Sequence, residues 1–573
     1  MADLPQLTLD DYEVRFADRH LVHNIVRKWA KEKPGAPAIV NADRGTSLDW
    51  ATFDAETNKL ARAVQGLGLR KGDFVATSLP LTTEHIIFEF ACFKAGVIVA
   101  PLDLRLAPAE VIRCINVIGA KAFVFLGKSP LADFRDLGRA VHNNCASVQH
   151  LIQFSPPEEL IEGAQAFESL SNPAGQELTG EVSENDGALV IFTTGSTGSP
   201  KPALLSHRNI TCQCMCISQA FFEGDNGTRM LVNLPASHVG CQTELMMGTL
   251  FGGGTAVILE TFDAVRSLRA IPEHKVKKIG QIPALFNFEW RLRDYSSYDL
   301  SSLDFAAYGG QQVSPAFMKK MAAMAPRIAT GLGLTESAGF CTYILEDSAS
   351  ASSDGAAILN SLGIAMPVYP FTIRQAMRDD GSAGDELTTG EIGHVCFRGP
   401  QTFLGYINDP EATARTISTD GWLYTGDLGF RDERGHLHMT GRAKWVIKSF
   451  GYQIFPADVE NHIALLEDKV ASCAVVGAEH AIISEGIVAF VEKKPGAEPT
   501  LQELDRHARG LSAYMRPRHW VILEPGQMPL TRTVKPDYVR LSQMAREEIA
   551  RLRAAGKWDK ATTEFAIDKL RTS

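Results

Sequence analysis

Short runs of apolar residues alternate with amphipathic stretches through most of residues 1–440. The runs at 122–126, 189–193 and 255–259 have the length of buried strands, and the segments between them have the spacing of helices. Strands that alternate with helices usually form a mainly parallel sheet covered by helices, with loops at the strand ends that can carry chemistry. The pattern predicts an α/β fold with a large N-terminal body of several subdomains.

The pattern changes between Asp380 and about Thr440, where short strands separated by turns are expected at 393–399, 421–424 and 436–439. This stretch predicts a small β-rich subdomain. His436 and His438 alternate along the last of these strands and have no obvious partner, so we expect both rings to face solvent.

A compact α+β unit begins past Gly441. Thr500, with Glu503 three residues later, forms a capping box that opens a helix. Strands are expected on either side of that helix and a charged helical tail at the end of the unit, at 470–476, 487–491, 520–523 and 535–553.

These changes of pattern divide the chain into two unequal parts. We predict an N-terminal domain over residues 1–440, a hinge over 441–444, and a smaller, mobile α+β C-terminal domain with a helical tail over 445–573.

The longest apolar stretch, 86–102, contains Glu89 and Lys94. Both charges are costly in hydrocarbon, and the stretch is shorter than the roughly 20 residues that span a bilayer. We therefore expect a buried helix that runs into a strand, and no membrane span. The first residues are acidic and lack the basic and apolar pattern of a leader sequence, which favours a cytoplasmic protein.

Charge and cysteine content exclude some classes of protein. The formal net charge is −10, so no overall field would attract nucleic acid or an anionic membrane, and an anionic ligand needs a local site. The ten cysteines lack the spacing of a disulfide scaffold and indicate a reducing compartment. Cys212, Cys214 and Cys216 resemble a metal cluster, but on a helix the middle thiol points away from the other two, so we expect buried structural cysteines.

The most informative segment is 191–201, in which a strand leads into small and hydroxylated residues that end at Lys201. Backbone N–H groups, hydroxyl donors and a cation in one loop suit phosphate oxygens. A Walker loop is excluded, because Pro200 and Pro202 flank Lys201 and the next helix is expected only after Ser206. The alternative is an ordinary surface turn.

This loop resembles the signature of the adenylate-forming superfamily, which includes acyl-CoA synthetases, firefly-type luciferases and the adenylation domains of peptide synthetases. Further segments resemble the motifs of that superfamily in the correct order along the chain. They are 234–240, 308–311, 331–336, 424–427, 441–444, 448–453 and 529–535.

The resemblance implies an ATP site and a Mg²⁺ site. Glu336 would be the Mg²⁺ ligand, because a hard cation that bridges phosphates prefers a carboxylate. Asp427 would bind the ribose hydroxyls, and Arg442 the ribose or a phosphate. The other nucleotide-binding residues would be Thr193, Thr194, Gly195, Ser196, Thr197, Gly198 and Lys201 around the phosphates, and Tyr308, Gly309, Gly310, Gln311, Gly331, Leu332, Gly333 and Thr335 elsewhere in the site.

The resemblance also implies two half-reactions. Lys535 would reach from the small domain to the carboxylate and the α-phosphate as a movable positive charge. His238 would stand beside the acyl pocket. In the second step the small domain rotates about Lys444, so that Lys448, Gly451 and Tyr452 turn toward the site and admit the pantetheine arm of CoA.

Three residues depart from the family pattern. Leu332 stands where an aromatic ring often stacks on adenine, so stacking should be poorer or come from Tyr308. Pro202 replaces a glycine after Lys201 and stiffens the end of the phosphate loop. Val534 replaces the glycine before Lys535, which could alter the reach of that lysine.

We therefore expect an AMP-forming carboxylic acid–CoA ligase that uses ATP, Mg²⁺ and CoA. The acid is expected to be short, branched or hydroxylated, in a pocket lined by Cys241, Gln242 and Phe340. Two alternatives stay open: a ligase that passes its acyl-adenylate to a separate carrier protein, and a catalytically silent nucleotide-binding scaffold. A dimer is the common default for soluble enzymes.

Overall fold

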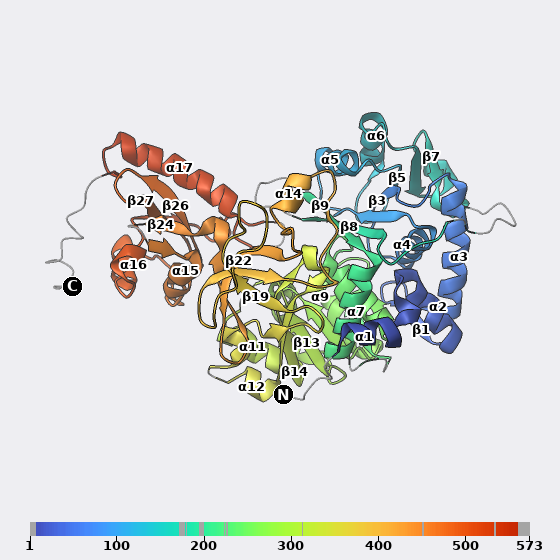
Figure 1. Cartoon of the computed structure of the whole chain (residues 1–573), viewed down its shortest axis with the longest axis horizontal. Helices are drawn as coiled ribbons and strands as arrows, with labels where there is room; N and C mark the ends of the chain where they lie inside the picture. The colour runs from blue at the N-terminus through green and yellow to red at the C-terminus, as the bar shows by residue number, and fades with distance from the viewer. Residues whose placement is uncertain are drawn as a thin grey trace.

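The computed structural model describes residues 7–170, 178, 180–193, 200–222, 224, 227–311, 313–353, 355–449, 452–531 and 535–559. The chain forms a large body and a smaller lobe that lies to the left in Figure 1. The large α/β body and the small C-terminal α+β unit confirm the fold class expected from the sequence.

Two large sheets form the body. The first has nine strands in the order β18-β17-β14-β13-β12-β10-β11-β1-β2, and its central strands from β14 to β1 are parallel. The strand bounds in that order are Ile364–Ala365, Thr342–Asp347, Arg327–Thr330, Phe305–Tyr308, Lys278–Gln281, Arg229–Val232, Thr255–Ile258, Pro37–Asn41 and Thr46–Asp49.

The second sheet has eight strands in the order β21-β9-β8-β4-β3-β5-β6-β7. It is parallel from β8 to β7, and β9 runs antiparallel to β8. The strand bounds are Gly405–Tyr406, Lys201–Ser206, Gly187–Thr193, Ile98–Pro101, Phe74–Ser78, Ala122–Leu126, His150–Phe154 and Ala164–Ala166.

Two buried helices join these sheets. Helix α4 (Thr83–Ala95) and helix α7 (His207–Phe221) place their side chains in one apolar core with residues from both sheets. Ser206 caps α7, so the helix begins where the sequence indicated. Cys212, Cys214 and Cys216 on α7 have no exposed surface, which confirms that they are buried.

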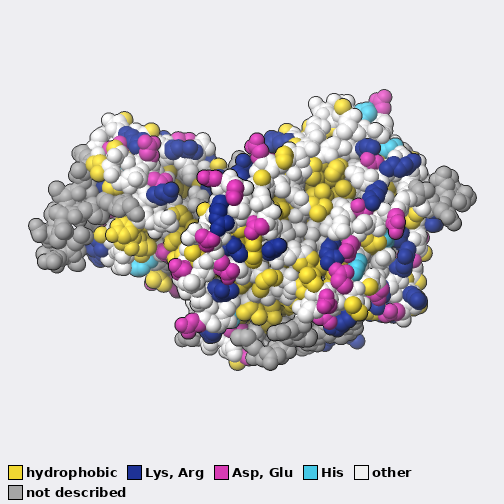
Figure 2. Space-filling view, in the orientation of Figure 1, with side chains coloured by type: hydrophobic (Ala, Val, Ile, Leu, Met, Phe, Trp, Pro, Cys, Tyr) yellow, Lys and Arg dark blue, Asp and Glu magenta, His cyan; other side chains and the backbone are white. Residues whose placement is uncertain are grey.

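The apolar stretch 86–102 forms α4 and then β4, as expected. No helix in the described part of the chain is both long and apolar enough to cross a membrane. On the face shown in Figure 2, positively and negatively charged side chains are interspersed.

The β-rich subdomain is a four-stranded antiparallel sheet in the order β19-β20-β22-β23. Its strands span Phe371–Arg374, Gly393–Phe397, Leu423–Arg431 and Leu437–Arg442. The expectation that His436 and His438 face solvent is wrong. His436 is 4% exposed, with Nδ1 3.2 Å from Ser361 Oγ, and the His438 ring stacks on Phe430 and lies 2.9 Å from an Asp432 carboxylate oxygen.

The smaller lobe contains a five-stranded sheet. Strand β27 pairs with β24, β26 and β28, and β25 pairs with β24. Helices α15 and α16 pack on one face of the sheet and α17 on the other (Figure 1). The strands β24 to β28 span Ile447–Ser449, Tyr452–Ile454, Val470–His480, Ser484–Lys493 and His519–Leu523, and the helices Pro456–Ala464, Leu501–Ala508 and Tyr538–Ala554.

Local signals in this lobe behave largely as expected. Thr500 accepts a hydrogen bond from the Glu503 N–H, which confirms the capping box. The tail helix begins at Tyr538 and not at Lys535, because Asp537 accepts hydrogen bonds from the next N–H groups as the N-cap and Pro536 forms a bridge with Leu530.

The remaining helices mostly cover the two large sheets of the body. They are α1 (Leu9–Arg15), α2 (Val22–Glu32), α3 (Trp50–Gly66), α5 (Pro108–Ile118), α6 (Arg135–Asn144), α8 (Gly248–Phe251), α9 (Ala264–Glu273), α10 (Pro283–Trp290), α11 (Pro315–Ala322), α12 (Ser348–Ala351), α13 (Ala357–Asn360) and α14 (Pro410–Ala414).

Candidate active site at the boundary of the lobes

The stem of the phosphate-type loop is the β8–β9 hairpin, in which Thr193 pairs with Lys201. Strand β21 lies beside β9, and the Lys201 ammonium stands 5.0 Å from the ring centre of Tyr406 on β21. The hairpin therefore fixes where the loop begins and ends. The predicted phosphate ligands Thr194, Gly195, Ser196, Thr197 and Gly198 lie outside the described residues.

Glu336 lies at the tip of a short hairpin formed by β15 (Gly333–Leu334) and β16 (Gly339–Phe340). Its carboxylate accepts a 2.6 Å hydrogen bond from the Tyr406 hydroxyl, and its carbonyl oxygen accepts one from the Phe403 N–H. Burial and the nearby Glu336 charge raise the pKa of Tyr406, so that phenol stays a donor. Tyr406 thus connects the Glu336 carboxylate to Lys201, a contact that the motifs did not indicate.

The base of this hairpin depends on Gly331. A Cβ atom there would lie 2.0 Å from the carbonyl oxygen of Thr342, closer than any side chain allows. The neighbouring Leu332 N–H donates to the Thr342 hydroxyl at 3.0 Å. Thr335 lies with Glu336 in a 3₁₀ turn, half-buried. The glycine therefore allows the close backbone approach that positions Glu336.

Asp427 on β22 pairs across the sheet with Arg442 on β23. The Arg442 Nε lies 2.6 Å from Asp427 Oδ1, whereas Oδ2 is buried with no hydrogen-bond partner among the described residues. Burial raises the pKa of Asp427, and the positive charges of Arg442 and Lys535 oppose that shift. A carboxylate oxygen with an unused acceptor fits a ribose hydroxyl.

Lys535 approaches this group from the smaller lobe. Its Cε lies 4.0 Å from the position that a Cβ atom would take on Gly310, at the end of β13. Burial and the Arg442 charge lower the pKa of Lys535, while Asp427 opposes the change. Thr531 N–H donates to the Lys535 carbonyl. The structure therefore brings Glu336, Asp427, Arg442 and Lys535 into one electrostatically coupled group.

The segment expected beside adenine is only partly open. Gly310 and Gln311 are exposed and Gly309 is half-buried. The Tyr308 ring is 3% exposed, packs edge-on against Phe317 and donates its hydroxyl to the Ile358 carbonyl. The ring is thus already packed on one side, and the structure gives no support to stacking by Tyr308.

His238 lies beside the loop stem. It lines a cavity of about 40 Å³ together with Asp103, Phe192 and Pro200. Burial lowers the pKa of His238, which keeps the imidazole neutral near neutral pH. The histidine can therefore shape a pocket wall without adding charge.

The residues expected to act in the second step lie elsewhere. Lys448 lines a groove of about 650 Å³ between β24 and the four-stranded sheet, where Arg374 and His394 form part of the opposite wall. Tyr452 is 55% exposed and stacks on Tyr514, while Lys444 lies over the Trp445 ring. Gly451 lies outside the described residues. Lys448 and Tyr452 thus stand on a different surface of the lobe from Lys535.

Two of the residues expected in the acyl pocket have another role. Cys241 and Gln242 are fully buried in the π-helix η4 (Gly240–Met247), and Gln242 donates to Glu89 on α4 at 2.8 Å. They connect η4 to the core. Phe340 fits better, because its ring lies close to both Gly309 and Gly331.

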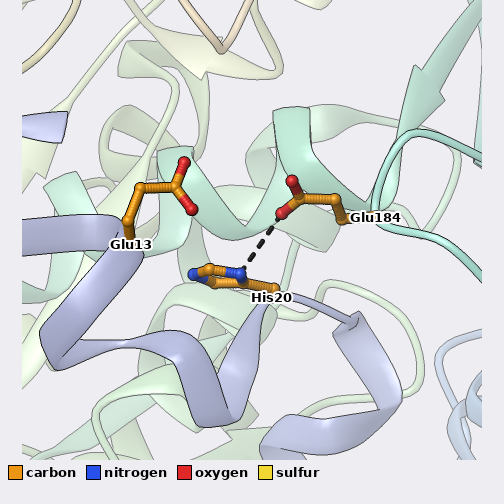
Figure 3. Close-up of side chains that lie close together, drawn as sticks. All are labelled: Glu13, His20 and Glu184. Carbon is orange, nitrogen blue, oxygen red and sulfur yellow. Dashed lines mark ion pairs between the residues drawn. The ribbon is translucent and has the colours of Figure 1, made fainter. Parts of the chain in front are cut away.

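Glu13, His20 and Glu184 form the only group of possible metal ligands found among the described residues (Figure 3). His20 lies 3.3 Å from Glu184, and Arg208 makes ion pairs with both glutamates. The guanidinium already compensates the two carboxylates. The group therefore fastens α1 to the body, and we assign no metal to it.

The sequence matches two protein-family models and resembles several characterised enzymes. A family model described as AMP-binding enzyme matches residues 26–407, and one described as AMP-binding enzyme C-terminal domain matches residues 458–535. A feruloyl-CoA synthase from an Amycolatopsis species is 29% identical over 78% of this chain and 84% of its own length. The long-chain-fatty-acid–CoA ligase FadD13 of Mycobacterium tuberculosis is 27% identical over 87% of this chain and 94% of its own.

Solved structures show the same fold. The amide bond synthetase McbA from Marinactinospora thermotolerans has a TM-score of 0.78 at 27% identity, over 91% of this chain and 99% of its own. The ATP-bound MatB from Rhodopseudomonas palustris has a TM-score of 0.77 at 22% identity, over 92% of this chain and 99% of its own.

Proposed function

The chain belongs to the family of AMP-binding enzymes, and we propose that it is an AMP-forming acid–CoA ligase. In the first half-reaction a substrate carboxylate oxygen attacks the α-phosphorus of ATP, the bond to the β-phosphate oxygen breaks, and pyrophosphate leaves. In the second, the CoA sulfur attacks the acyl carbon, the bond to AMP breaks, and the thiol proton passes to solvent.

The observation that carries this proposal is the group at the boundary of the lobes. Lys535 comes from the smaller lobe, whereas Glu336 and Asp427 belong to the body. Two anions must meet in the first step, so a positive charge at that point offsets their repulsion as charge develops at the α-phosphate. The depressed pKa of Lys535 reflects a partly desolvated ammonium, which acts more strongly than one in water.

The other residues bind and orient the nucleotide. Asp427 Oδ2, which has no partner among the described residues, would accept from a ribose hydroxyl, and Arg442 holds the other oxygen of that carboxylate. Lys201, at the end of the loop, neutralises phosphate charge. Mg²⁺ bound at Glu336 would screen the phosphates, and the donor set fits this role because a carboxylate is present where the phosphates are expected.

The acceptor step uses a second arrangement of the lobes. We propose that the smaller lobe turns about residues 441–444, which removes Lys535 and brings the surface with Lys448 and Tyr452 toward the acyl-adenylate. The change from the four-stranded to the five-stranded sheet falls between β23 and β24, next to this segment. The domain boundaries at 440 and 445 are part of this proposal.

A second candidate is amide formation, in which an amine takes the place of the thiol. It is favoured by the likeness to an amide bond synthetase at 27% identity over 91% of this chain. Both candidates share the first half-reaction and differ only in the nucleophile.

The test uses the purified full chain with ATP, Mg²⁺ and a panel of short, branched, hydroxylated and long-chain acids. ATP–pyrophosphate exchange reports adenylation, and a silent scaffold would give none with any acid. Mass spectrometry of products with CoA, a carrier protein or an amine then identifies the acceptor. Acyl-CoA is the expected product, and AMP release without acyl-CoA would contradict our choice of acceptor.

A further inference from the structure

The side chain of Glu244 lies near the proposed reacting centre. From Lys535 the path runs to Gly310 and Gly309, where a Cβ atom would lie 3.9 Å from the Phe340 ring. The residue before Phe340 on β16 is Gly339. A Cβ atom on Gly339 would lie 2.8 Å from the carboxylate of Glu244 on η4. An acid bound at Lys535 that followed these contacts would place its remote end at Glu244.

Three glycines let the backbone approach this carboxyl closely, because a side chain at any of them would contact it. A Cβ atom on Gly333 would lie 3.4 Å from one Glu244 oxygen, and a Cβ atom on Gly240 would lie 3.5 Å from the other. Gly339 has a φ of +135°, in the region that favours glycine. Glu244 keeps some accessible surface.

A buried amide points at the same spot. The Nε2 atom of Gln213 on α7 lies 3.0 Å from the Cβ position of Gly339, which the Glu244 carboxylate also approaches. Gln213 has no exposed surface, and neither its Nε2 nor its Oε1 has a hydrogen-bond partner within the described part of the chain. A fully buried amide without partners is rare, because each unmade hydrogen bond costs free energy.

Two other buried glutamates, Glu289 and Glu460, have more hydrogen-bond donors around them than Glu244, whereas Glu89 also has one oxygen without a partner among the described residues. Glu289 accepts hydrogen bonds from Ser267 and Gln281, and Glu460 from Tyr538 and the Val475 N–H. For Glu244 the backbone N–H of Phe340 is the one donor identified among the described residues, and burial raises its pKa to about 8. The carboxyl therefore has acceptor capacity that nothing described here uses.

We propose that the acyl pocket selects acids that carry a hydrogen-bond donor, a hydroxyl or an amine, at the end remote from the reacting carboxylate, and that Glu244 and Gln213 bind this group. The inference rests on the proposed adenylation. A plain alkyl tail would bury against Glu244 and Gln213 and leave their polar atoms unbonded. A site built around hydrogen-bonding groups rejects a substrate that lacks the partner.

The test measures kcat/KM in ATP–pyrophosphate exchange for matched acids. Hexanoate is compared with its terminal hydroxyl and amino derivatives, and phenylpropanoate with its para-hydroxyl derivative. The wild-type enzyme is expected to prefer a donor-bearing member by about tenfold or more. Glu244→Leu and Gln213→Leu are expected to bring that ratio close to one while exchange with the plain acid persists.

Glu244→Gln separates the two donor chemistries. A glutamine can still accept a hydrogen bond from a hydroxyl but cannot compensate the charge of an ammonium. The variant should therefore keep a preference for the hydroxyl-bearing acid and lose the preference for the amino-bearing acid. Glu289→Gln is the matched control, because it changes a buried glutamate with raised pKa that is already hydrogen-bonded. It should leave every ratio unchanged.

The possible failures are distinguishable. Equal kcat/KM within every pair, or a preference that survives both leucine variants, overturns this inference and leaves the proposed ligase intact. Absence of exchange with every acid in the wild type overturns the proposed function as well. Thermal unfolding of each variant, with and without ATP, shows that the variants compared are folded and bind nucleotide.

Discussion

At the scale of single residues, the chemistry depends on charges held where water is scarce. Lys535 and Asp427 have pKa values shifted toward their neutral forms by burial, and each partly offsets the shift of the other. Such opposed shifts are typical of functional sites. Tyr406 adds a neutral donor to Glu336 without bringing further charge.

Lys535→Ala is expected to reduce ATP–pyrophosphate exchange by about a hundredfold or more, because it removes the positive charge at the developing α-phosphate. Thioester synthesis from supplied acyl-adenylate should remain largely intact, since adenylation is bypassed. Lys557→Ala, which removes an exposed lysine on the same lobe, is the control. Equal loss in both half-reactions would contradict the assigned role.

At the scale of elements, the β15–β16 hairpin connects the nucleotide region to the proposed acyl pocket. Its tip presents Glu336, and its strands hold Gly333 and Gly339 against Glu244. The π-helix η4 provides Glu244 and is fastened to α4 by the Gln242–Glu89 hydrogen bond. Displacement of either element should disturb both parts of the site.

Gly331→Ala should displace this hairpin, because the new Cβ would meet the Thr342 carbonyl. We expect a loss of about 1–3 kcal/mol in the free energy of unfolding and a marked fall in exchange activity. Gly35→Ala is the control, since nothing lies within 4 Å of its Cβ position. Thermal unfolding measures the stability of both variants, and ATP–pyrophosphate exchange measures their activity. Unchanged activity in Gly331→Ala would argue that the hairpin does not position Glu336.

The buried Glu89 on α4 predicts a pH dependence of stability. Burial raises its pKa to about 8 from the usual 4.5, so between these values the unfolded chain has released a proton that the native state retains. The free energy of unfolding therefore falls as pH rises through this window, by about 1.4 kcal/mol per pH unit for this group.

Glu89→Gln cannot ionise and should be less sensitive to pH. The melting temperature of the wild type is expected to fall more steeply between pH 4.5 and pH 8 than that of the variant. Glu56→Gln, which changes a half-exposed surface glutamate, should follow the wild type. Parallel curves for all three proteins would show that Glu89 is ionised in the native state throughout this range.

At the scale of the whole molecule, the small lobe places Lys535 at its boundary with the large body. The lobe has apolar cores of its own on both faces of its sheet, as the proposed rotation requires. Lys535 and Lys448 lie on different surfaces of that lobe, and the charge of Lys535 lowers the pKa of Asp427. This is the arrangement that the proposed adenylation step requires.

Lys444→Pro should impair rotation of the lobe, because proline fixes the backbone φ at a position that has to change. Exchange is expected to persist while thioester formation falls at least about tenfold. Lys444→Ala removes the charge without restricting the backbone and is the control. Unchanged overall turnover in the proline variant would place the hinge elsewhere.

The sequence by itself determined the alternation of strands and helices, the family, and the residues at the motifs. Strand β8, the cap at Ser206 and the capping box at Thr500 depend on neighbouring residues, so the sequence alone can indicate them. The motifs identify Glu336 and Asp427 without showing what surrounds them.

Only the tertiary structure decided which distant groups meet. The hydrogen bond from Tyr406 to Glu336, the burial of Tyr308 and the pairing of His438 with Asp432 follow from packing between elements. Glu244 and Gln213 have no motif that marks them, and they acquire meaning because Gly339 lets them approach one point. Burial and desolvation are properties of the packed molecule, so a linear pattern cannot contain them.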